Sequence, residues 1–184
     1  MLDTLETLSE TVDMKTRQAP IRETYQRLPS AAQISDHAIT RSDNISVDQP
    51  LYGEVEFGDT RRTRLPISLH EGVGGKSDLP VPGELFCGAI ASCLDSTIRV
   101  ISNMLGVALS SLEVAVEAEV DLRGTLRMDP DVKTAFGDLN VQVNMVPVAD
   151  VPQHYLDAIL TAAEQSCVVL QTLRHPPRIS IARL

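Results

Sequence analysis

A long apolar stretch lies near the middle of the chain. Between Pro82 and Leu105, apolar residues cover most of the circumference of a helix: Leu85, Phe86, Ala89, Ile90, Ala91, Leu94, Ile98, Ile101, Met104 and Leu105. Pro82 suits the first turn of such a helix, and Gly106 suits the position just after its end. A helix that is apolar on most faces is normally surrounded by protein. We therefore predict a central, buried helix over residues 82–105.

The segments after this helix alternate between apolar and polar residues, as half-buried strands do. The pattern predicts strands from Leu112 to Leu122, from Leu139 to Met145 and from Arg178 to Leu184. Between the last two, an amphipathic helix is expected from about Gln153 to Ser166. Its expected buried side consists of Tyr155, Leu156, Ile159, Ala162 and Ala163.

Residues 51–70 have the pattern of a β-hairpin. Two apolar-polar segments flank the turn residues Gly58-Asp59-Thr60-Arg61. Pro66 lacks the N–H group that a central strand needs, so the second strand should lie at an edge or contain a bulge. Nowhere does the chain alternate strand, helix and parallel strand. The sequence therefore predicts an α+β fold in which antiparallel sheets surround one long helix.

The first 50 residues differ from the rest of the chain. Leu2, Leu5, Leu8 and Val12 have helical spacing and predict a short amphipathic helix. The stretch from Pro29 to Pro50 is polar and shows no sustained periodicity. We interpret residues 1–50 as an N-terminal arm and residues 51–184 as one domain.

Charge and composition exclude several functions. The chain of 184 residues has 16 Lys and Arg against 25 Asp and Glu, a net charge of −9, and only 3% aromatic residues. An acidic chain with few aromatic side chains for stacking binds nucleic acid and anionic membranes poorly. No apolar run has the length of a membrane span, and the N-terminus lacks signal-peptide features. We expect a cytoplasmic protein that binds neither nucleic acid nor membranes.

The three cysteines are the remaining candidates for chemistry. With an odd number of cysteines, no Cys-x-x-Cys motif and scattered histidines, we expect no metal, cofactor or disulfide framework. Cys87 and Cys93 are six residues apart on the predicted helix, which separates them by about 9 Å and about 240°. They cannot bridge each other, so either could pair only with Cys167. Because unpaired cysteines are usually buried core residues, we assign Cys87 to the core.

The run Pro82-Gly83-Glu84-Leu85-Phe86-Cys87-Gly88-Ala89-Ile90-Ala91-Ser92-Cys93-Leu94 resembles the central-helix signature of the OsmC/Ohr superfamily, the osmotically inducible and organic hydroperoxide resistance proteins. Further similar segments are 105–107, 116–124 and 163–167, and the resemblance spans about residues 52–184. It implies an intertwined α+β homodimer. It also implies a thiol-dependent peroxidase that acts on small apolar hydroperoxides and is regenerated by a dithiol reductant. By motif position, Cys93 would be the peroxidatic cysteine and Cys167 the resolving one.

Two features depart from the family's peroxidases. Their motif usually carries a Glu directly after the proline, which positions an Arg beside the thiolate; this chain has Gly83 there and Glu84 one residue later. The Arg would come from Arg61, Arg62 or Arg64, and we select Arg62, with Glu84 as the carboxylate. The second cysteine is usually followed by Pro-Tyr-Ser, whereas this chain continues with Val168-Val169-Leu170. The alternative is therefore a non-catalytic dimeric protein that binds a small apolar ligand in the same cleft.

Overall fold

The computed structural model describes residues 12–60 and 62–183. The predicted N-terminal helix lies outside these residues except for Val12, which is not helical. The predicted central helix is confirmed as α3 (Pro82–Leu105). Its first turn is closed by Glu84, whose Oε2 accepts a hydrogen bond of 2.9 Å from the Val81 N–H group. Gly106 ends the helix in the left-handed region, with φ of 74°, where glycine is favoured.

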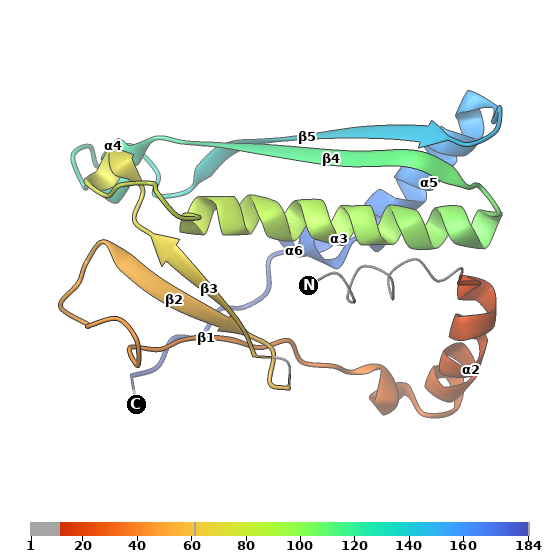
Figure 1. Cartoon of the computed structure of the whole chain (residues 1–184), viewed down its shortest axis with the longest axis horizontal. Helices are drawn as coiled ribbons and strands as arrows, with labels where there is room; N and C mark the ends of the chain where they lie inside the picture. Colours follow the sequence, from red (N-terminus) through yellow and green to blue (C-terminus); the bar gives the residue numbers. More distant parts are fainter. Residues whose placement is uncertain (1–11, 61, 184) are drawn as a thin grey trace.

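The C-terminal half of the chain packs around α3. A long antiparallel hairpin of β4 (Leu109–Val120) and β5 (Phe136–Pro147) covers one side of the helix (Figure 1). The predicted helix α5 (Gln153–Ser166) and a second helix, α6 (Val168–Arg174), also contact α3. The core between these elements is formed by Leu94, Ile98, Leu156, Ile159, Ala163 and Cys167.

The predicted hairpin of residues 51–70 is confirmed as β2 (Tyr52–Phe57) and β3 (Thr63–Ser68). A short strand, β1 (Ala38–Thr40), completes a three-stranded antiparallel sheet in the order β1-β2-β3. Pro66 therefore lies in an edge strand, as its missing N–H group predicts. The N-terminal arm, residues 1–50, therefore contributes one strand, β1, to this sheet.

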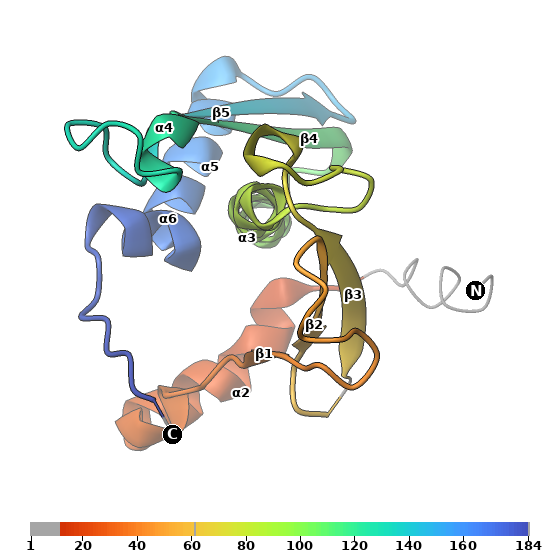
Figure 2. The ribbon, with the colours of Figure 1, turned by 90° about the vertical axis from the view of Figure 1, so that its left-hand side faces the viewer.

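The arm also contains α2 (Met14–Arg27), followed by a 3-10 turn over Pro29–Ala32. Asp13 caps α2 by accepting a hydrogen bond of 3.0 Å from the Lys15 N–H group. Figures 1 and 2 show α2 and the three-stranded sheet on the opposite side of α3 from β4 and β5. Asn103 near the end of α3 attaches the arm: its side chain donates to Val12 O at 2.7 Å and accepts from Met14 N at 2.8 Å.

Several predictions about the C-terminal half were wrong in detail. β4 ends at Val120 because Asp121 caps a short helix, α4 (Leu122–Thr125). The side chain of Tyr155 is 50% exposed, because α5 buries only a narrow strip formed by Leu156, Ile159 and Ala163. Residues 178–183 form no strand, because no other strand of the described chain lies beside them to pair with.

The single chain leaves much of α3 uncovered. The most apolar 18-residue window of this helix has a mean hydropathy of 1.4, yet only 22% of that window is buried. By length and composition alone such a helix could cross a membrane, a property that it shares with core helices of globular proteins. Only Ile90, Leu94, Ile98 and Ser102 of α3 are buried. The predicted burial of α3 is therefore confirmed for one side of the helix, and the rest of its surface is uncovered in the single chain.

Candidate functional site: two cysteines between α3 and α6

The two motif cysteines come from elements far apart in the sequence and lie together. Cys93 is in the middle of α3, and Cys167 is the single residue between α5 and α6. Cys167 is completely buried within the core, and the partly exposed Cys93 packs against the same core. All three cysteines of the chain are free thiols. The fold therefore places one accessible thiol beside one inaccessible thiol.

The surroundings of Cys167 favour its protonated form. Burial is the largest effect and raises the pKa of the Cys167 thiol, and its interaction with Cys93 acts in the same direction. The backbone N–H groups of Leu170 and Val169, at the start of α6, lower that pKa but do not reverse the shift. Because the thiolate is the nucleophile, Cys167 is a weak nucleophile in the reduced protein.

The nearest carboxylate along the chain from Cys93 is already neutralised. Asp95 follows Cys93 by two residues and would oppose a thiolate if it were unpaired. Instead it forms an ion pair with Arg99, one turn further along α3, with Nε and Oδ2 2.7 Å apart. The side chain of Thr97 donates to the Cys93 carbonyl oxygen at 2.7 Å and not to its sulfur.

The described chain does not bring the candidate arginines to Cys93. Arg61 lies outside the described residues, and Arg64 is held between Glu54 and Glu56 at 3.1 and 2.9 Å. The exposed Arg62 adopts a φ of 48° in the turn, and its Nε donates to the Asp59 carbonyl oxygen at 3.4 Å. Figures 1 and 2 show the beginning of β3 on the side of this sheet remote from α3. Of Arg62 and Arg64, only Arg62 has no ion pair with a carboxylate that the structure describes.

Glu84 has a structural task in this chain, because its carboxylate closes the first turn of α3. The position where the family's peroxidases carry a Glu, Gly83, is covered by an aromatic ring. A Cβ atom at Gly83 would lie 3.4 Å from Phe136 Cζ. Phe136 in turn stacks on Phe86 of α3, with ring centroids 5.0 Å apart and ring planes 13° from parallel. The described chain thus places an aromatic pair, and no Arg–Glu pair, at this end of α3.

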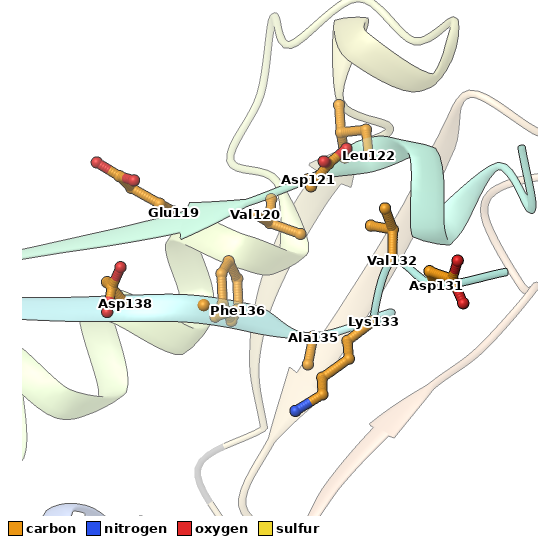
Figure 3. A pocket seen from close by; sticks show the side chains of 11 residues that line it. Glu119, Val120, Asp121, Leu122, Asp131, Val132, Lys133, Ala135, Phe136 and Asp138 are labelled. Carbon is orange, nitrogen blue, oxygen red and sulfur yellow. The ribbon is translucent and has the colours of Figure 1, made fainter. Parts of the chain in front are cut away.

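An open cavity of about 780 Å³ lies beside Phe136, at the end of the β4–β5 hairpin (Figure 3). It is lined by Glu119, Val120, Asp121, Leu122, Asp131, Val132, Lys133, Ala135, Phe136, Gly137 and Asp138. Sequence reasoning missed this aromatic pair and its cavity. Phe86 was visible as an apolar helix residue, but Phe136 follows a loop and has no periodic signal. Over residues 12–60 and 62–183, no group of three or more His, Cys, Asp or Glu could hold a metal ion.

The comparison with protein families decides the classification. The family model described as OsmC-like protein matches residues 75–182, which is more than half of the chain. The chain belongs to the OsmC-like protein family. The matched residues include α3, β4, β5, α5 and α6, and therefore both Cys93 and Cys167.

Solved structures share this OsmC-like fold. An OsmC-like protein of unknown function from Vibrio cholerae is 14% identical, with a TM-score of 0.61, covering 76% of this chain and 94% of that protein. The organic hydroperoxide resistance protein OsmC from Legionella pneumophila is 20% identical, with a TM-score of 0.54 and coverages of 77% and 90%. One from Elizabethkingia anophelis is 16% identical, with a TM-score of 0.58 and coverages of 78% and 91%.

No curated protein sequence is significantly similar to this chain. The similarity covers 90–94% of each of the three structures described above but only 76–78% of this chain. About a quarter of this OsmC-like protein therefore has no counterpart in them.

Proposed function

We propose that this protein is a thiol peroxidase that reduces organic hydroperoxides through Cys93 and Cys167. The proposal rests on one observation: these two cysteines, one partly exposed and one buried, lie together between α3 and α6. Two similar folds belong to organic hydroperoxide resistance proteins, from Legionella pneumophila and Elizabethkingia anophelis, which supports the same substrate class here.

The exposure of the two sulfurs assigns their roles. The Cys93 thiolate attacks the terminal peroxide oxygen and the O–O bond breaks, so Cys93 becomes a sulfenic acid and the substrate leaves as an alcohol after taking up a proton. Cys167 then loses its proton and attacks the Cys93 sulfur. The hydroxyl group of the sulfenic acid departs as water, and a Cys93–Cys167 disulfide forms.

A dithiol reductant of unspecified identity completes the cycle by exchanging with this disulfide. One hydroperoxide and one dithiol give one alcohol, one water molecule and one oxidised dithiol, so that atoms and electrons balance. The cytoplasm, where we expect this acidic protein, keeps such dithiols reduced.

We also propose that the working unit is a homodimer. Three observations support it: the uncovered apolar surface of α3, the exposure of Ile179 and Ile181 at 80% and 93%, and the absence of a candidate arginine beside the chain's own Cys93 among the described residues. A second copy would cover the first two features, and its hairpin would supply the arginine, for which Arg62 stays our selection.

A second function is favoured by one observation. Phe136 lies over Gly83 and the Glu84 carboxylate caps α3, so the start of α3 offers no free carboxylate to position an arginine. This arrangement suits a non-catalytic protein that binds a small apolar ligand near the cysteines.

Consumption of cumene hydroperoxide with dithiothreitol as reductant distinguishes the two functions. We expect Cys93→Ser to lower turnover by about 100-fold or more, because no other described thiol takes its place. Cys87→Ser, on the same helix, is the matched control and should retain wild-type turnover. Equal rates for wild type and Cys93→Ser would exclude the peroxidase and leave the binding protein.

A further inference from the structure

An aromatic surface lies on the same face of α3 as the proposed nucleophile. Phe86 precedes Cys93 by seven residues, which places it about 10 Å along the helix with a rotation of only about 20°. Ala89 lies between them, three residues after Phe86, and it is exposed. Its side chain is a single methyl group, which obstructs little of this face between Cys93 and Phe86.

Phe136 extends this aromatic surface away from the helix. Its ring is stacked on Phe86 and lies against Gly83, where a Cβ atom would be in van der Waals contact with it. Stacked and offset rings attract a further aromatic group more strongly than an aliphatic group of similar size. The aromatic pair thus favours a flat ring in a ligand that extends from Cys93 toward the start of α3.

The charged side chains that line the adjoining cavity act on any charged group of a ligand. Its lining contains four carboxylates, Glu119, Asp121, Asp131 and Asp138, and one cation, Lys133 (Figure 3). Asp121 is paired with Arg123 at 2.5 Å, whereas Glu119 and Asp138 form no ion pair with any described residue. A molecule with its own carboxylate is repelled here, and the repulsion weakens as salt is added.

We propose that the Phe86–Phe136 pair is the specificity-determining wall of the thiol site and that, together with the acidic lining beyond it, it selects neutral aryl hydroperoxides over hydroperoxides that carry a carboxylate. The inference rests on the proposed function, because it names the substrate class of that same site. It adds a role for Phe136, a residue that the family motif does not contain.

The aromatic part is tested with Phe136→Leu, which removes the ring and keeps an apolar side chain. The ratio of kcat/KM for cumene hydroperoxide to that for tert-butyl hydroperoxide should fall by about fivefold to tenfold. Tyr155→Leu removes an exposed aromatic ring on α5 and should leave the ratio unchanged. Phe86→Leu is the second variant if Phe136→Leu fails to fold. An unchanged ratio in the folded variant would overturn the assignment.

The charge part is tested with two substrates that differ only in charge, linoleic acid hydroperoxide and its methyl ester. The methyl ester should have the higher kcat/KM at low ionic strength, by about tenfold, and added salt should reduce the difference. In the double variant Glu119→Gln, Asp138→Asn the difference should also shrink. A preference for the free acid, or a preference unaffected by salt and by the double variant, would overturn this part.

Binding to Cys93→Ser separates this inference from the peroxidase proposal. The product alcohol of cumene hydroperoxide, 2-phenyl-2-propanol, should bind to this variant more tightly than tert-butanol, as measured by ligand-observed NMR. Adding Phe136→Leu should remove the difference. If wild type consumes no hydroperoxide but this binding difference is present, the peroxidase fails and the aromatic wall is retained. If turnover occurs without any binding difference, the wall is wrong and the peroxidase is retained.

Discussion

Cys167 combines complete burial with a position at the start of a helix. Burial raises its pKa, and the first backbone N–H groups of α6 counteract only part of that effect. A thiol in this environment is protected from peroxides in solution, yet it lies beside Cys93. At the scale of single residues, the proposed roles of Cys93 and Cys167 therefore rest on their different exposure.

Alkylation measures this difference directly. At pH 8 we expect iodoacetamide to modify Cys93 at least about tenfold faster than Cys167, because the Cys167 sulfur is inaccessible and its pKa is raised. The folded protein keeps the Cys167 proton at pH values where the unfolded chain has lost it, so the free energy of unfolding should fall as the pH rises through the alkaline range. In guanidinium both cysteines should react alike. Equal rates in the folded protein would contradict the assignment.

The helix α2 of the arm is attached at one end of α3. α2 buries none of its residues, and the Asn103 side chain makes two hydrogen bonds to the backbone of Val12 and Met14. Since α2 contributes little apolar contact, we infer that these bonds largely set the position of α2, whereas β1 is held by its pairing with β2.

Asn103→Ala should detach α2 without unfolding the domain. Two hydrogen bonds contribute about 1–2 kcal/mol together, so the detached fraction should rise by about tenfold. Limited trypsin digestion reports this as faster cleavage after Lys15, Arg17, Arg22 and Arg27. Ser96→Ala, an exposed site on the same helix, is the control. Equal digestion of the variant and wild type would show that other contacts hold the arm.

The elements that the sequence predicted well are those with a strong period of their own. α3 and α5 have the predicted bounds, and β2 and β3 form the predicted hairpin, because helical spacing and turn residues are local signals. α2 has little apolar periodicity and β1 has three residues, so neither gave a signal. The alternation of Ile179 and Ile181 is real, but a strand also needs a neighbouring strand, which no local pattern can provide.

The candidate site, like the fold, was predicted from the sequence only in part. The motif identified Cys93 and Cys167, and the structure brings them together although their catalytic roles stay a prediction. The motif could not show that Glu84 would cap α3, because capping depends on the geometry of the helix start. Nor could it show that Phe136 would stack on Phe86, since that contact joins two elements far apart in the sequence.

At the scale of the whole molecule, the single chain has apolar surface in three separate places. α3 is covered mainly on one side, the C-terminal segment extends without partners in the described chain, and the Ile21, Tyr25 and Leu28 side chains of the arm are 46%, 39% and 56% exposed. Surface of this extent is typical of an interface between subunits. A symmetric pair of chains could bury all three places at once.

Light scattering tests the homodimer. At micromolar concentration we expect a mass of about 40 kDa, twice the 20.0 kDa of the chain. Ile179→Asp combined with Ile181→Asp should shift the protein toward monomers, because two charges would enter an apolar interface. Val168→Asp, which adds one such charge at another exposed apolar residue, is the control. A stable monomer of wild type would contradict the intertwined architecture.

Peptide mapping after oxidation tests the central claim most directly. Reduced protein is treated with one equivalent of cumene hydroperoxide, and its disulfides are identified by mass spectrometry. Our account predicts one intramolecular bond between the Cys93 and Cys167 peptides, with Cys87 still a free thiol. In Cys167→Ser, one equivalent should leave Cys93 as a sulfenic acid, and a second equivalent should oxidise it to sulfinic acid, because no thiol captures it. A bond between Cys87 and Cys167 with Cys93 reduced, or three unmodified thiols, would contradict the account.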